Sequence, residues 1–180
     1  LLPGRDLCGQ VVVGDIGIPD SVLADIAPRT MTNHPQTWMA SLPRPGADAN
    51  KFRRGHAVIW GGDQMTGAAR LAARAARRIG SGMLTIAADP DVFAIYAADA
   101  PGTLVSPVPD AEAFRELLAD ERRNAILVGP GAGVNGETRQ RVLDALDTGR
   151  PCVLDADALT VFQDNPEVLF EAIRGPCVMT

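Results

Sequence analysis

The sequence predicts an α/β protein built on a mostly parallel sheet with helices on both faces. From residue 51 onward, short apolar runs of strand length alternate with longer stretches whose apolar residues recur at helical spacing. The apolar runs are continuous rather than interrupted by polar residues, which is typical of strands buried on both faces. Ligands of such sheets bind at the carboxyl ends of the strands, so the loops that follow the strands are the first places to look for a site.

Composition narrows the class of protein. The chain has 180 residues, of which 46% are hydrophobic and 22% are charged, as in ordinary soluble domains. Its formal net charge of -5 gives no reason to expect nucleic acid or an acidic membrane surface as partner. No apolar run approaches the roughly 20 residues of a membrane span, and no signal peptide is recognisable. The cysteines Cys8, Cys152 and Cys177 lack metal-ligand spacing, so we expect no metal site, buried thiols and a cytoplasmic protein.

Residues 1–50 differ from the rest of the sequence. An apolar run at 10–13 predicts a single strand, and the stretch that follows is rich in proline and has little periodicity. This pattern predicts the end of a preceding domain followed by a linker. Because the chain opens in apolar sequence without a start methionine, we expect it to be part of a longer protein.

Residues 57–88 predict a complete strand-helix-strand unit. A strand at 57–60 ends at two glycines, a helix follows over 66–79 with Thr66 as its N-cap, and Gly80 ends the helix before a second strand at 83–87. Small residues on the helix should let its backbone approach the sheet closely; they are Ala68, Ala72, Ala75 and Ala76. The turn faces a helix N-terminus, which suits an anion or a closely packed ligand.

The remaining segments repeat this plan. Helices are predicted over 91–98, 110–121, 137–146 and 166–173, and strands over 103–106, 125–128, 152–154 and 176–179. In the second of these helices, Phe114, Leu117 and Leu118 are expected to face inward.

The glycine turn after the first strand resembles a phosphate-binding loop only in part. Gly62 and Gly67 have the spacing of a P-loop, but Ala68 and Ala69 occupy the positions of its lysine and its magnesium-binding hydroxyl. A nucleoside triphosphatase of that class is therefore excluded. The turn either admits a ligand against backbone amides or needs glycine only for its dihedral angles.

A second glycine-rich loop lies at 129–136, between a predicted strand and a predicted helix. Gly131, Gly133 and Gly136 satisfy the dinucleotide fingerprint G-x-G-x-x-G, and Asp155 follows near the offset of a ribose-binding acid. A Rossmann-type oxidoreductase is therefore one interpretation. Against it, Pro130 stiffens the turn, and such a fingerprint usually opens its domain, whereas three strands precede it here. The other interpretation is a ligand loop of a different kind.

Two carboxylates follow the strand at 152–154. Asp155 and Asp157 could hold a polar ligand or a metal, or one of them could simply cap the next helix. Asp157 suits the cap and Asp155 suits a site.

Together these residues resemble the NAD(P)H-hydrate dehydratases. The resemblance covers residues 51–180 and rests on five motifs in the same order: KFRRGH at 51–56, GG-x4-GA at 61–68, ARAARRIGSG at 73–82, GPGAG at 129–133 and VLDADAL at 153–159. Upstream, GDIGIP at 14–19 is similar to the end of the NAD(P)H-hydrate epimerase domain that precedes the dehydratase in bifunctional repair enzymes. The resemblance thus implies that residues 1–50 are the end of an epimerase domain plus a linker, and that 51–180 are the N-terminal part of a dehydratase domain.

The resemblance also implies a fold, an activity and site residues. The fold would be a ribokinase-like three-layer α/β/α sheet, incomplete in this chain. ADP, or ATP in some members, would phosphorylate the hydroxyl of NAD(P)H hydrate, with Mg²⁺ on the phosphates, and loss of phosphate would restore the cofactor. By motif, Ala68 and Gly133 would line the hydrate site; we add Gly62, Gly131, Asp155 and Asp157. A homo-oligomer is expected.

The chain departs from the family pattern in one respect. The family's Thr-Pro-His segment, lysine-containing nucleotide loop and Gly-x-Gly-Asp turn are not in this sequence. The catalytic base, the aspartate of that last turn, is therefore expected beyond Thr180, and the isolated chain is expected to have negligible activity. A noncatalytic nucleotide-binding module is an alternative besides the Rossmann interpretation.

Overall fold

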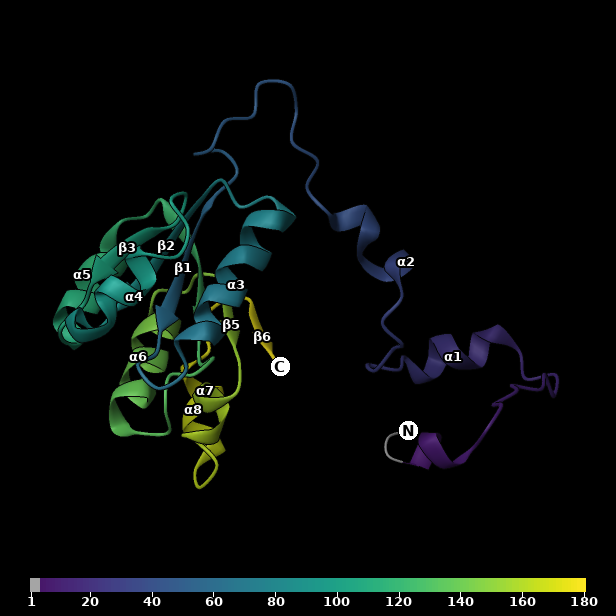
Figure 1. Cartoon of the computed structure of the whole chain (residues 1–180). Helices are drawn as coiled ribbons and strands as arrows, with labels where there is room; N and C mark the ends of the chain where they lie inside the picture. The colour runs from purple at the N-terminus through teal and green to yellow at the C-terminus, as the bar shows by residue number, and fades with distance from the viewer. Residues whose placement is uncertain (1–3) are drawn as a thin grey trace. The chain divides into compact units, whose positions relative to one another are not determined.

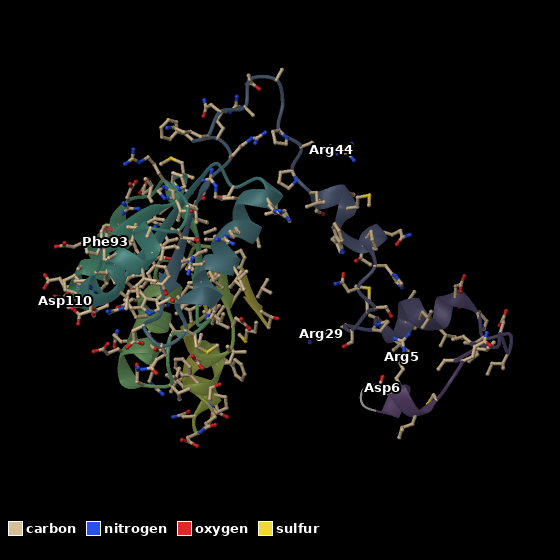
Figure 2. All side chains as sticks on the ribbon, in the orientation of Figure 1. Arg5, Asp6, Arg29, Arg44, Phe93 and Asp110 are labelled. Atoms are coloured by element: carbon tan, nitrogen blue, oxygen red, sulfur yellow. The ribbon has the colours of Figure 1, made fainter. Side chains whose placement is uncertain are left out.

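The computed structural model describes residues 4–180, which form two units with a boundary between Arg44 and Pro45. Over residues 4–44, the N-terminal unit contains only short helical segments; they are η1 (Gly4–Leu7), α1 (Asp20–Ile26), α2 (Pro35–Trp38) and η2 (Met39–Ser41). Its side chains project from the chain and are exposed (Figure 2). Residues 10–13, predicted as a strand, are irregular and exposed, so that prediction is wrong for this chain. A strand needs a partner for its backbone hydrogen bonds, and the described part of this unit offers none.

The second unit is built on one six-stranded sheet in which every neighbouring pair is parallel (Figure 1). The strands are β1 (His56–Gly61), β2 (Met83–Ala88), β3 (Leu104–Pro107), β4 (Arg123–Val128), β5 (Cys152–Leu154) and β6 (Cys177–Met179). Their spatial order is β3-β2-β1-β4-β5-β6, so the chain builds outward from β1 in one direction and then returns to add β4 on the other side of β1. The predicted parallel sheet is confirmed, and its topological switch point lies between β1 and β4.

Helices cover both faces of the sheet, which confirms the three-layer α/β/α architecture. On one face lie α3 (Thr66–Ile79), η3 (Pro90–Val92) and α4 (Phe93–Ala97). On the other lie α5 (Ala111–Ala119), α6 (Gly136–Asp147), α7 (Asp157–Thr160) and α8 (Pro166–Ala172). Successive side chains of a strand point to opposite faces, so Val58 and Trp60 of β1 enter one core and Ile59 enters the other.

The core of the α5 and α6 layer contains the residues expected of it. Phe114, Leu117 and Leu118 of α5 are buried, as predicted, and the ring of Phe114 meets that of Trp60 edge-on with 5.5 Å between centroids. Asp110 begins α5 as its N-cap, because its Oδ1 accepts from the backbone N–H of Ala113 at 2.8 Å. Figure 2 labels Asp110 at the start of this helix.

Helix α3 packs on the sheet with part of the predicted alanine face. Ala72 and Ala76 are partly buried against the core, as predicted, but the fully buried alanines are Ala69 and Ala73, and Ala75 is exposed. Thr66 is its first residue and not its cap; Met65 occupies the N-cap position and makes no side-chain capping bond. Gly80 ends the helix in the left-handed conformation, as predicted (φ 115°).

The cysteines are free thiols in different environments. Cys152 is buried and Cys177 partly buried, but Cys8 is exposed in the N-terminal unit, which corrects the prediction of three buried thiols. Among residues 4–180, no helix is both long and apolar enough to cross a membrane.

Candidate functional site

The two glycine-rich loops meet at the switch point of the sheet. One follows β1 and contains Gly61 and Gly62; the other follows β4 and runs from Gly129 to the start of α6. Neighbouring strands that lead to helices in opposite directions leave a crevice between their carboxyl ends, and ligands of open α/β sheets bind there. The structure thus brings together two motifs that are 67 residues apart, from Gly62 to Gly129.

The loops contact each other through backbone atoms. A Cβ placed on Gly62 would lie 1.6 Å from the carbonyl oxygen of Gly131 and 2.8 Å from Cα of Ala132. Gly131 itself has a φ of 67°, and a Cβ on it would lie 2.7 Å from the carbonyl oxygen of Met65. Because both glycines are in close backbone contact, their first role is to let the two loops pack together.

Tyr96 of α4 fixes the position of the first glycine loop by a hydrogen bond. Its side chain is fully buried, and its hydroxyl donates a hydrogen bond of 2.5 Å to the carbonyl oxygen of Gly62. Burial raises the pKa of Tyr96 to about 12, with a further increase from the charge of Asp63. Tyr96 was not predicted as a site residue, since the only feature that distinguishes it in the sequence is that it is the single tyrosine of the chain.

Asp157 of α7 fixes the position of the second glycine loop by a hydrogen bond. Its Oδ2 accepts a hydrogen bond of 2.8 Å from the backbone N–H of Gly133, which has a φ of 82°. The prediction that Asp157 caps the next helix is wrong, because Ala156 is the N-cap of α7 and no side chain bonds to the free amides. Ala156 has a φ of 48°, an uncommon conformation for alanine, and this turn directs Asp157 back to the glycine loop.

The remaining predicted site residues, Asp155 and Ala68, make no side-chain hydrogen bond to either glycine loop. Asp155 directly follows β5; its backbone N–H donates to the carbonyl oxygen of Val128 and its own carbonyl oxygen packs on Gly129. Its side chain has no hydrogen bond within residues 4–180. Ala68 is half-buried in the first turn of α3. Ligand-binding roles for Ala68, Gly62, Gly131, Gly133, Asp155 and Asp157 stay predictions.

A cavity of about 180 Å³ opens beside the loops, on the side of α6. It is lined by Trp60, Gly61, Gly62, Asp63, Asp89, Asp91, Ala132, Asn135, Glu137 and Thr138. Gly62 is the one predicted site residue among them. The acidic side chains were not predicted because they are scattered over three separate loops. The only signal in the sequence is that each of them follows a strand or opens a helix.

The cavity lies at the N-terminus of α6. Asn135 caps this helix by accepting a hydrogen bond of 2.8 Å from the backbone N–H of Thr138, and the hydroxyl of Thr138 donates to the carbonyl oxygen of Ala132 at 2.9 Å. One turn further along α6, Arg141 is only 4% exposed, and its guanidinium carbon lies 4.2 Å from the centroid of the Trp60 ring. Burial lowers the pKa of Arg141, and nearby carboxylates, Glu137 first among them, oppose this shift.

The acidic residues of the site do not form a metal centre. In the part of the chain that the structure describes, no three His, Cys, Asp or Glu side chains are placed to hold a metal ion together. A magnesium ion would therefore need ligands from outside these residues, such as the phosphates of a nucleotide.

Comparison with known proteins identifies the family. The sequence profile of the family described as NAD(P)H-hydrate dehydratase matches residues 56–180, which includes both glycine loops and all six strands. The chain belongs to the NAD(P)H-hydrate dehydratase family. This confirms the resemblance drawn from the motifs and sets aside the Rossmann oxidoreductase, although the strand order found here is also that of a Rossmann sheet.

Relatives are bifunctional enzymes much longer than this chain. The chain is 31% identical over 170 residues to the bifunctional NAD(P)H-hydrate repair enzyme Nnr of Coxiella burnetii, covering 94% of this chain and 34% of that protein. It is 34% identical over 176 residues to the protein of the same name from Mycobacterium tuberculosis, covering 96% and 33%. The chain thus spans about a third of the length of these curated relatives.

Solved structures share the fold. The ADP/ATP-dependent NAD(P)H-hydrate dehydratase of Bacillus subtilis, co-crystallized with ATP/Mg²⁺, superposes with a TM-score of 0.59 at 29% identity, over 70% of this chain and 46% of that one. A ribokinase-like superfamily protein of Enterococcus faecalis gives a TM-score of 0.60 at 24% identity, over 68% and 44%, which shows the fold alone. The predicted ribokinase-like fold is confirmed.

Proposed function

We propose that this chain supplies part of the substrate site of an ADP- or ATP-dependent NAD(P)H-hydrate dehydratase, and that the polypeptide carrying it repairs hydrated nicotinamide cofactors. The observation that carries the proposal is the meeting of the Gly62 and Gly131 loops at the switch point, within a chain of this family. Backbone amides at such a crevice, next to the N-termini of α3 and α6, suit the anionic phosphates of a dinucleotide.

The proposed reaction converts a poor leaving group into a good one. The nucleotide transfers a phosphoryl group to the hydroxyl of the hydrated ring, and the phosphate then leaves with its bonding electron pair while a ring proton is lost. Phosphoryl transfer depends mainly on positioning and electrostatic stabilisation, so rigid loops are what the fold must provide. Tyr96 and Asp157 provide this rigidity by holding the two loops through hydrogen bonds.

We further propose the domain arrangement and surroundings that the motifs predict. Residues 1–50 would be the end of an epimerase domain and a linker, and 51–180 the N-terminal part of the dehydratase domain. The boundary between the two structural units, after Arg44, supports a division in this region. Magnesium would arrive with the nucleotide, and the protein would act in the cytoplasm as a homo-oligomer.

The test uses the full-length polypeptide that contains this chain. It is incubated with chemically hydrated NADPH and ADP, and the return of dihydronicotinamide absorbance is followed. We expect recovery that requires ADP or ATP. Binding of nucleotide and cofactor without recovery, by folded protein, would instead favour a noncatalytic nucleotide-binding module.

A further inference from the structure

Two of the cysteines lie directly opposite each other in the sheet. Cys152 is the first residue of β5 and Cys177 is the first residue of β6, and the register of these parallel neighbours pairs the two residues (Figure 1). Both are free thiols. No spacing rule connects them in the sequence, so only the pairing of the two strands brings them together.

The two thiols also share one face of the sheet. Residues paired across neighbouring parallel strands project to the same side, and both cysteines pack into the core that α6 covers. The Sγ of Cys152 donates to the carbonyl oxygen of Ala145 on α6 at 3.7 Å. Neighbouring strands lie about 4.7–4.9 Å apart, within the range of roughly 4.4–6.8 Å between the Cα atoms of a disulfide. A bond between the two sulfur atoms therefore fits the strand pairing as it stands.

The two thiols differ in access and in acidity. Cys152 is buried, whereas Cys177 is partly exposed on β6, which lies at one end of the sheet in residues 4–180. Burial, followed by the charge of Cys177, raises the pKa of Cys152 to about 12, and burial alone raises the pKa of Cys177. Since the thiolate of Cys177 opposes ionisation of Cys152, Cys177 ionises first. The thiolate is the nucleophile in disulfide exchange, so Cys177 is the residue that reacts first with an oxidant.

We propose that Cys152 and Cys177 form a site of reversible oxidation, in which a disulfide links β5 to β6. The oxidant is a small disulfide such as oxidised glutathione. The thiolate of Cys177 attacks one of its sulfur atoms, forms a mixed disulfide and releases one glutathione. Cys152 then loses its proton, and its thiolate attacks Sγ of Cys177 and releases the second glutathione. The protein loses two electrons and two protons, and the two molecules of reduced glutathione carry both.

The disulfide would fix the end of the sheet covalently. Strands β5 and β6 pair through three residues each, so few hydrogen bonds attach β6 to the sheet. A disulfide between them closes the loop formed by residues 153–176 and restricts the unfolded chain. The two cysteines begin their strands, whereas the glycine loops follow the carboxyl ends of β1 and β4. The inference is therefore independent of the proposed function.

Peptide mapping of the full-length polypeptide that contains this chain tests the proposal. The protein is incubated with excess oxidised glutathione, its remaining thiols are alkylated in denaturant, and it is digested with trypsin without reduction. Trypsin cleaves after Arg174, so Cys152 and Cys177 fall in separate peptides that only a disulfide can join. We expect the joined peptides in the mass spectrum and their separation by dithiothreitol. Recovery of the two cysteines alkylated, as separate glutathione adducts or joined to other cysteines would overturn the proposal.

Two variants test the order of the steps. Cys152→Ala should stop the reaction at the mixed disulfide, with glutathione on Cys177. Cys177→Ser should leave the buried Cys152 to react at least about tenfold more slowly than Cys8, the exposed thiol that serves as internal control. No adduct on Cys177 in the first variant, or equal labelling of Cys152 and Cys8 in the second, would contradict attack by Cys177.

Urea unfolding tests the effect of the link on the sheet. The unfolding midpoint of the oxidised wild type should lie at higher urea concentration than that of the reduced protein, and dithiothreitol should reverse the shift. The Cys177→Ser variant is the matched control and should show no shift after the same treatment with oxidised glutathione. An unchanged midpoint in protein shown by mass to carry the link would overturn its stabilising role.

Discussion

Replacing Gly62 by alanine should force the two glycine loops apart. The new Cβ would lie 1.6 Å from the carbonyl oxygen and 2.4 Å from the carbonyl carbon of Gly131. Unstrained carbon contacts lie at about 3.5–4 Å, so the backbones must separate by about 2 Å. No rotamer change can relieve the contact, because the atoms involved belong to the backbone of a loop that also contacts Met65 and Asp157.

The expected cost lies at the upper end of the range for overpacking. Insertion of one carbon into a packed site costs about 1–3 kcal/mol, and for Gly62→Ala we expect about 3 kcal/mol. For a chain of this size that corresponds to a decrease in melting temperature of about 6–12 °C. The assay is urea and thermal unfolding followed by circular dichroism.

Gly67→Ala is the matched control. Gly67 lies five residues further along, in the first turn of α3, and a Cβ on it would meet nothing within 4 Å. Alanine is the better helix former, so this variant should be unchanged or more stable by up to about 1 kcal/mol. If Gly62→Ala were no less stable than Gly67→Ala, the close contact between the loops would not exist in solution and the site as described would be wrong.

Three further changes test the residues that support the site. Tyr96→Phe leaves the carbonyl of Gly62 unpaired and should cost about 1–3 kcal/mol at neutral pH. Because the pKa of Tyr96 is raised from 10.0 to about 12, its contribution is complete below pH 10 and is lost as the pH rises toward 12; urea unfolding at several pH values should show this loss in the wild type and not in the variant. Asp157→Ala should cost about 1–3 kcal/mol by leaving the N–H of Gly133 unpaired, whereas Asp157→Asn, which keeps an acceptor, should cost less in the same assay. Phe114→Ala should cost about 3–5 kcal/mol in urea unfolding, and a smaller value would mean that the core collapses around the gap.

Local patterns predicted the elements of the second unit well. Helix 66–79 and strand 152–154 were predicted with the bounds that the structure has, because Gly80 and the prolines and glycines around the strand end these elements locally. The inward face of α5 also followed from its spacing. The alternation of strand and helix then left a parallel sheet as the one arrangement that buries every apolar run.

Errors arose where the outcome depends on a partner that is distant in sequence. The apolar run at 10–13 has the composition of a strand, but none of the strands in residues 4–180 pairs with it. Asp157 has the position of a helix cap, yet the backbone N–H of Gly133, 24 residues earlier, takes its side chain. Composition and position indicate only which structure a residue favours locally. At 10–13 the hydrogen bonds to a distant strand are missing, and at Asp157 a hydrogen bond to a distant backbone N–H is present.

The sequence by itself determined the family, the α/β/α class and the two glycine motifs, because these depend on local spacing and on residues close together along the chain. Only the tertiary structure decided that Gly62 and Gly131 meet, that Tyr96 and Asp157 hold their loops, and that scattered acids surround one cavity. The physical reason is that a parallel sheet gathers the ends of its strands at one edge whatever their separation in sequence. The order in which the strands lie side by side is set by packing of the whole sheet, and that order places the loops of β1 and β4 against each other.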